Sequence, residues 1–118
     1  MNYPHLIFYT NNLPDNFHAC TNGFIIRMVP GYKNDEGLLK HELIHVKQFW
    51  LNGLLIHTIR YRFSKAYRLK CEVEAYREQL KYPPAITDLG YYKWIYAGFM
   101  AERYGLNITK EEALRSLI

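Results

Sequence analysis

The segment HELIHVKQFW, residues 41–50, constrains the fold of this chain more than any other stretch. It places His41, Glu42 and His45 in the order H-E-x-x-H. On an α-helix, with about 100° per residue, the two histidines lie within about 40° of each other. The opposite side of that helix carries Leu39, Leu43, Val46 and Trp50. The segment therefore predicts a two-faced helix, with the histidines on a polar face and the apolar side chains in the core.

The spacing of the two histidines suits a zinc ion. Residues four apart stand on adjacent turns, so both imidazoles converge on one point, as two nitrogen ligands of tetrahedral zinc must. Glu42 lies about 100° round the helix, within reach of a metal-bound water, and we predict that it acts as a general base. The alternative is an ordinary amphipathic helix with two solvent-facing histidines and a surface carboxylate beside Lys40. A chain of this composition contains H-E-x-x-H by chance roughly one time in a hundred, which favours the zinc interpretation.

A catalytic zinc ion needs a third protein ligand and an open position for water. The longer pattern H-E-x-x-H-x-x-G-x-x-H would supply a third histidine, but Gln48 and Leu51 occupy its glycine and histidine positions. His57 could fold back to the metal, although its mostly apolar neighbours favour a packed or capping histidine. The third ligand is therefore expected further along the chain.

The segment CEVEAY offers two carboxylates, Glu72 and Glu74. On a helix, Glu72 shares its side with Leu69 and Tyr76, whereas Glu74 shares its side with charged residues, so we predict Glu72 as the third ligand and Glu74 as a solvated ion-pair residue. Tyr76 lies one turn beyond Glu72, and we predict that its hydroxyl supports a ligand or stabilises a developing oxyanion. The alternative for Tyr76 is an aromatic ring packed under the site. Other candidate donors for the oxyanion are His57, Tyr61 and Arg68.

Turn residues, helix caps and apolar periodicity divide the chain into strands and helices. HLIFYT (residues 5–10) and GFIIRMVPGY (23–32) predict two strands with a loop between them. The first helix is expected to begin after a cap at Asn34 or Asp35 and to end at about Leu51. Further helices are expected from Ser64 to Pro83-Pro84 and over residues 86–104. A last helix should follow the capping box of Thr109 and Glu112. LLIHTIRYRF (54–63) is ambiguous between a helix and a bridging segment. These elements predict a single α+β domain, residues 1–118, dominated by helices, with a small N-terminal antiparallel β-sheet and an active-site helix.

Length and composition set the remaining bounds. With 118 residues, of which 49% are hydrophobic, the chain is long enough for one domain with a core and too short for two. No window reaches the roughly 18 to 20 uninterrupted apolar residues of a membrane span, and the N-terminus does not resemble a signal peptide. We expect a cytoplasmic protein with no membrane partner, in which Cys20 and Cys71 remain thiols.

The net charge of +4 is concentrated in the basic run RYRFSKAYRLK, residues 60–70. Such a run can attract nucleic acid, an acidic surface or an acidic substrate, and its plain alternative is a solvated helix face. Because no known nucleic-acid-binding motif accompanies the run, we expect nucleic acid not to be the partner.

The motifs HELIH and EVEA resemble those of the gluzincins, zinc metallopeptidases that carry H-E-x-x-H on one helix and a glutamate ligand on a later one. The resemblance covers residues 24–80, and it implies zinc ligands at His41, His45 and Glu72. It implies further that Glu42 polarises the water that attacks a peptide carbonyl, and that the strand FIIRMV offers its edge to an extended peptide. Related families carry a polar residue after the alanine of E-x-x-A, where this chain has Tyr76, so the groups that support the ligands are expected to differ.

The leading expectation is therefore a minimal zinc metallopeptidase that acts on a peptide or protein substrate. A chain this short leaves little room for a second subdomain, so a protein partner or self-association could complete a shallow cleft. The alternative is a non-catalytic zinc-binding module for protein interaction. A nucleic-acid-binding protein that uses the basic run is a third possibility, and its affinity would fall steeply with salt.

Overall fold

The computed structural model describes residues 3–14, 17–84 and 89–118. These residues form a small sheet and a larger set of helices, so the expected helix-dominated α+β class is confirmed. The elements are β1 (Leu6–Tyr9), β2 (Ala19–Asn22), β3 (Ile25–Met28), the 3-10 helix η2 (Pro30–Tyr32), α1 (Glu36–Asn52), α2 (Leu54–Phe63), α3 (Lys65–Gln79), α4 (Leu89–Arg103) and α5 (Lys110–Leu117).

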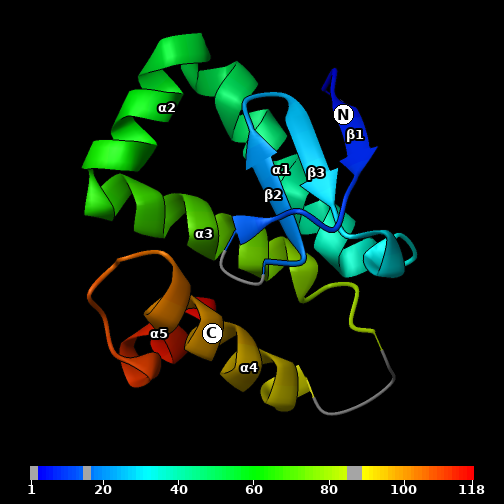
Figure 1. Cartoon of the computed structure of the whole chain (residues 1–118). Coiled ribbons are helices and arrows are strands. Elements are labelled where there is room, and N and C mark those ends of the chain that lie inside the picture. Colours follow the sequence, from blue (N-terminus) through cyan, green and yellow to red (C-terminus); the bar gives the residue numbers. More distant parts are fainter. Residues whose placement is uncertain (1–2, 15–16, 85–88) are drawn as a thin grey trace.

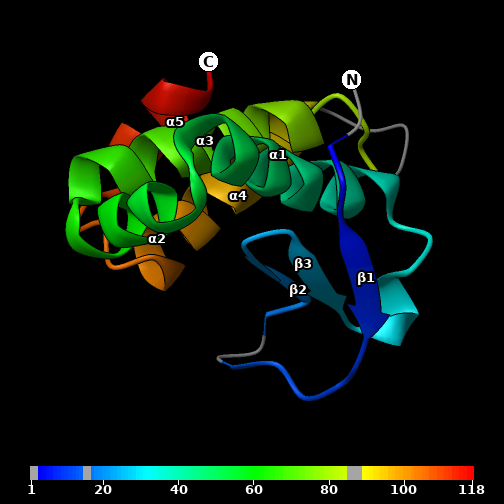
Figure 2. The same cartoon turned by 90° about the horizontal axis from the view of Figure 1, so that it is seen from above.

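Helix α1 links the sheet to the helical part of the molecule. It contacts the sheet through β2 and the other helices through α2 and α3. Figure 2 shows the sheet covering one side of the helical layer. In Figure 1, α4 and α5 pair with each other beyond α3, on the side of α3 that is away from the sheet. The facing sides of α1 and α3 consequently lie in the interior.

The sheet is mixed rather than purely antiparallel, which corrects the expected strand arrangement. Strand β1 runs parallel to β3, whereas β2 runs antiparallel to β3 and lies in a segment that we predicted as a loop. Gly23 and Phe24 form a two-residue hairpin loop between β2 and β3, and Gly23 has the positive φ, 65°, that such loops require at their first position. Because the hairpin occupies one edge of β3, β1 joins the other edge, and the order is β1-β3-β2.

Most predicted helix boundaries are confirmed. Asp35 caps α1 by accepting a hydrogen bond from the backbone N–H of Leu38, and Gly53, with a φ of 90°, ends it. The ambiguous segment 54–63 is the helix α2, and Ser64 then caps α3. The predicted capping box of Thr109 and Glu112 is present at the start of α5. Of the helix expected over 86–104, residues 86–88 lie outside the described part of the chain, and α4 covers the remainder up to Arg103.

The helices α3, α4 and α5 share an apolar core. Its buried members are Tyr76, Leu80, Tyr96, Ala97, Met100, Ala113 and Leu117. Burial of these side chains holds the α4–α5 pair on one side of α3 and leaves the other side of α3 to face α1.

Two further expectations concern membranes and thiols. Among the described residues, no helix combines the length and the apolar character that a membrane crossing requires. Cys20 and Cys71 are not joined by a disulfide, as expected.

The replacement Gly37→Ala is expected to lower the free energy of unfolding by about 1–3 kcal/mol, the usual cost of overpacking. Gly37 is buried in the first turn of α1, where an added Cβ would lie 2.6 Å from the carbonyl oxygen of Tyr82 and 3.1 Å from that of Gln79. Backbone at the end of α3 would have to move. Urea unfolding followed by circular dichroism measures the change.

The matched control is Gly31→Ala, because a Cβ at Gly31 would meet nothing within 4 Å. A Gly37→Ala protein that is as stable as the parent and as Gly31→Ala would contradict the close packing of α1 on the end of α3.

Candidate metal centre

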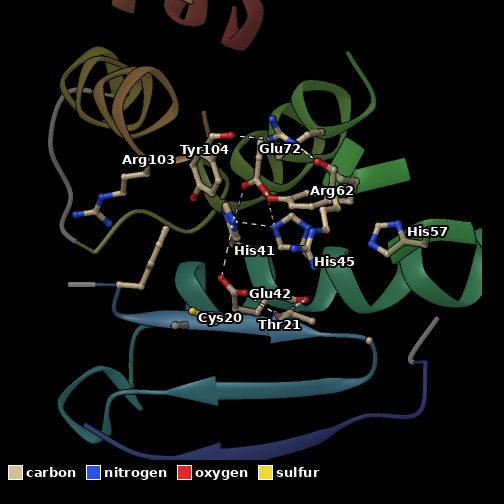
Figure 3. A pocket seen from close by; sticks show the side chains of 15 residues that line it. Cys20, Thr21, His41, Glu42, His45, His57, Arg62, Glu72, Arg103 and Tyr104 are labelled. Carbon is tan, nitrogen blue, oxygen red and sulfur yellow. Dashed lines mark hydrogen bonds and ion pairs between the residues drawn. The ribbon is translucent and has the colours of Figure 1, made fainter. Parts of the chain in front are cut away.

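Helices α1 and α3 bring three ligand-type side chains together. His41 and His45 project from α1 toward Glu72 on α3 (Figure 3). The Nε2 atoms of His41 and His45 lie 3.3 and 3.1 Å from the two carboxylate oxygens of Glu72, and 3.2 Å from each other. One ligand atom from each residue lies within 4.8 Å of the others. This group of His41, His45 and Glu72, the metal cluster below, could hold a metal ion.

The metal cluster is buried, so the alternative of two solvent-facing histidines is wrong. His41 and Glu72 are 4% and 1% exposed. The histidines share one side of α1, as predicted, but Glu72 of α3 covers that side and shields it from solvent. Trp50, which we expected in the core, is 40% exposed. The angular pattern of one helix shows which residues share a side, but not which sides its neighbours will cover.

Gln48 orients His45. Its Nε2 donates to the backbone carbonyl of Cys71 and to the carboxylate of Glu74, so its Oε1 is the atom that faces His45. That oxygen lies 2.9 Å from Nδ1 of His45 and accepts the Nδ1 proton. When Nε2 of His45 is deprotonated, as a metal ligand must be, this proton on Nδ1 leaves the lone pair of Nε2 directed at the metal cluster. Gln48 thus supplies the hydrogen-bonded support that metal-ligating histidines usually have.

The carboxylate of Glu72 and the imidazole of His45 shift each other's pKa. Burial opposes the charged form of Glu72, but His45 and His41 outweigh burial and hold its pKa well below the usual range. Burial likewise opposes the charge on His45, but the Glu72 carboxylate outweighs burial and raises the pKa of His45 to about 9. Within the described part of the chain, the metal cluster has two buried atoms without a hydrogen-bond partner, Nδ1 of His41 and Oε1 of Glu72. A buried carboxylate with an unused acceptor, facing two imidazoles, is a donor set that a divalent cation satisfies.

Glu42 lies beside the metal cluster without joining it. Its Oε2 is 3.8 Å from Nε2 of His41, and its Oε1 accepts a hydrogen bond of 2.7 Å from the hydroxyl of Thr21. Because Thr21 belongs to β2, the sheet fixes the orientation of this carboxylate. The Glu42 carboxylate is therefore held in a fixed orientation next to the metal cluster.

A pocket of about 420 Å³ opens onto the metal cluster and onto Glu42. Its walls include residues of β2, α1, α2 and α3 and the end of α4. The strand at this pocket is β2, not the strand at residues 24–29 that we expected to offer its edge. The reason is that β3 lies in the middle of the sheet, with β1 on one side and β2 on the other.

No family model matches this sequence, and none of the curated proteins or solved structures compared with it is significantly similar. The resemblance to the gluzincins consequently rests on the motifs HELIH and EVEA alone.

The two competing candidates for the third ligand are engaged elsewhere. Glu74 is exposed and pairs with Lys47 at 2.5 Å, as expected for a solvated ion-pair residue. His57 lines the pocket, but it does not belong to the metal cluster, and its Nδ1 lies 2.8 Å from the hydroxyl of Tyr67. Both positions agree with the preference for Glu72 that the sequence indicated.

The hydroxyl that supports Glu72 comes from Tyr61 and not from Tyr76. Tyr61 donates to Oε2 of Glu72 at 2.5 Å. Tyr76 is 4% exposed, its ring packs on His41 with centroids 4.4 Å apart, and its hydroxyl pairs with that of Tyr104 at 2.6 Å. Tyr61 and Tyr104 line the pocket, whereas Tyr76 does not. This position does not support the predicted catalytic role of Tyr76 and agrees with a ring packed under the site.

From the sequence, Tyr61 of the pocket was named without being ranked, and Tyr104 and Thr21, which also bring hydroxyls to the pocket, were missed. Tyr61 was one of three candidate donors that could not be ranked from the sequence. Tyr104 is 32 positions beyond Glu72 in the sequence and shares no local pattern with it. Burial and the nearby Glu72 carboxylate raise the pKa of both tyrosines well above the usual value, so both remain protonated donors at neutral pH.

Arg68 fixes the chain segments that carry these two tyrosines. Its guanidinium donates to the backbone carbonyl of Tyr104 at 2.7 Å and to that of Tyr61 at 2.7 Å. Weaker hydrogen bonds reach the carbonyls of Arg62 and Gly105. One side chain of α3 therefore holds the ends of α2 and α4 against the pocket.

Proposed function

We propose that this chain is a zinc-dependent peptidase. The proposal rests on the buried metal cluster of His41, His45 and Glu72 at a pocket that Glu42 also lines. Two imidazoles from one helix and a carboxylate from another are a typical ligand set of catalytic zinc, which keeps a further position open. Calcium and magnesium prefer sites built of oxygen ligands, so zinc suits this cluster better.

Glu42 is the proton carrier of the proposed reaction. Zinc in the cluster would polarise the substrate carbonyl and make a water more acidic. Oε1 of Glu42 is engaged by Thr21, so Oε2, the oxygen nearer His41, takes the proton from the attacking water. The same oxygen then delivers the proton to the leaving amine nitrogen.

The edge strand β2 favours a peptide as the substrate. Ala19, Cys20 and Thr21 of β2 line the pocket next to the metal cluster. An extended peptide can add to a sheet edge through backbone hydrogen bonds, which positions its carbonyl groups along the strand. Strand addition of this kind suits a polypeptide backbone better than other hydrolysable amides or esters.

The test is metal-dependent cleavage by the purified chain. We expect about one zinc per chain by elemental mass spectrometry. Cleavage of a mixed peptide pool, read by mass spectrometry, should stop after chelation and return with zinc but not with magnesium. A zinc-saturated chain that cleaves nothing would contradict the peptidase and leave a structural zinc in a non-catalytic module. A chain that takes up no zinc after supplementation would contradict the metal centre as well.

A further inference from the structure

The basic run of residues 60–70 contributes directly to the pocket. Arg62 at the end of α2 and Arg68 in α3 both line it, and Arg103, the last residue of α4, adds a third guanidinium. The other cations of the run, Arg60, Lys65 and Lys70, do not line the pocket. Part of the run is therefore more than a solvated helix face.

Among the residues that the structure describes, no carboxylate pairs with these arginines. The acidic residues of the described chain that line the pocket are Glu42, which accepts a hydrogen bond from Thr21, and Glu72, which faces the two histidines of the metal cluster. The hydrogen bonds of Arg68 go to neutral backbone carbonyls. The pocket consequently has an excess of positive charge, which attracts an anionic ligand.

Arg103 is held in a geometry that suits a carboxylate. Its guanidinium carbon lies 4.2 Å from the ring centroid of Phe99 and 5.4 Å from that of Phe17, which also lines the pocket. A guanidinium that stacks on aromatic faces keeps the N–H groups at its planar edge available for a bidentate carboxylate. In Figure 3, Arg103 and Arg62 lie on opposite sides of His41. A ligand in the pocket can therefore meet arginine side chains from both α2 and α4.

We propose that the pocket selects peptides with an acidic side chain close to the scissile bond, and that Arg103 binds this carboxylate while Arg62 adds electrostatic attraction. This inference rests on the proposed peptidase function. A peptide fits better than a nucleic acid, because β2 offers an edge for backbone pairing beside the same arginines. Arg68 is excluded from the test, because its loss would also release Tyr61 and Tyr104.

The test compares two fluorogenic octapeptides that are identical except for two aspartates in one and two asparagines in the other. In the zinc-loaded parent, kcat/KM for the aspartate peptide should exceed that for the asparagine peptide. Loss of a charge-assisted hydrogen bond should reduce this ratio about 10- to 100-fold in Arg103→Gln, mainly through KM. Arg103→Lys keeps the charge without the planar fork and should retain part of the preference. The control Arg60→Gln removes an arginine of α2 that does not line the pocket, and it should leave the ratio unchanged.

Binding of the labelled peptides to zinc-loaded Glu42→Gln protein, read by fluorescence anisotropy, separates this inference from the hydrolysis itself. Cleavage with no preference between the two peptides would overturn the inference and leave the peptidase intact. Arg103-dependent binding of the aspartate peptide without any cleavage by the parent would support the inference as a binding preference and overturn the peptidase. Tighter binding of a single-stranded oligonucleotide than of the aspartate peptide would overturn the inference in favour of nucleic acid.

Discussion

Replacing Glu72 by glutamine is expected to lower the affinity of the chain for zinc by more than about 100-fold. Loss of a group that only hydrogen-bonds to a metal ligand lowers the affinity by about 10- to 100-fold, and loss of a ligand should cost more. Glu72 is 1% exposed, and both of its oxygens face a histidine Nε2 within 3.3 Å. Glutamine keeps the size of the side chain but removes the negative charge that compensates the cation. Titration with zinc against a competing chelator measures the change.

The control for this variant is Glu74→Gln. Glu74 lies two residues further along α3, but its carboxylate contacts Lys47 and Gln48 instead of the histidines. Loss of its charge should change the zinc affinity by no more than about 2-fold, because a surface ion pair contributes little free energy. Circular dichroism of both metal-free variants checks that the helices are retained. Zinc binding that survives in Glu72→Gln and fails in Glu74→Gln would show that the third ligand has been assigned to the wrong carboxylate.

The local features of this site could be predicted from the sequence because they depend on helix geometry alone. The spacing of His41 and His45 places both on one side of α1, and the difference of two residues between Glu72 and Glu74 sends them to different sides of α3. Capping residues such as Asp35 and Thr109 act through hydrogen bonds within one turn. Each of these predictions needed information from only one or two turns of a helix.

The features that the sequence did not reveal depend on contacts between distant segments. Strand β2 is short, and its sequence, Ala19–Asn22, is less apolar than that of β3, so the turn at Gly23 was the remaining signal for it. The exposure of Trp50 follows from where β2 and α3 pack on α1. Tyr61 reaches Glu72 because α2 folds back along α3, an arrangement that apolar periodicity does not encode.

The replacement Glu42→Gln is expected to lower kcat/KM for peptide cleavage by about 10²- to 10⁴-fold, the usual contribution of a general acid–base group. Glutamine can still accept the hydrogen bond that the Thr21 hydroxyl gives to Oε1 of Glu42, so the side chain stays in place and only its capacity to carry a proton is lost. Because Glu42 lies outside the metal cluster, the zinc content should equal that of the parent. Steady-state cleavage of a fluorogenic peptide and elemental mass spectrometry measure the two quantities.

Thr21→Val is the companion variant, because it leaves the carboxylate of Glu42 in the pocket but removes the hydroxyl that orients it. Its effect on kcat/KM should be smaller, about 10-fold, which is the scale of one charge-assisted hydrogen bond. Unchanged cleavage by Glu42→Gln would remove Glu42 from the reaction, whereas loss of zinc from that variant would make Glu42 a ligand instead of a base. The two readouts together therefore decide which of the two carboxylates at the pocket, Glu42 or Glu72, carries the proton and which holds the metal.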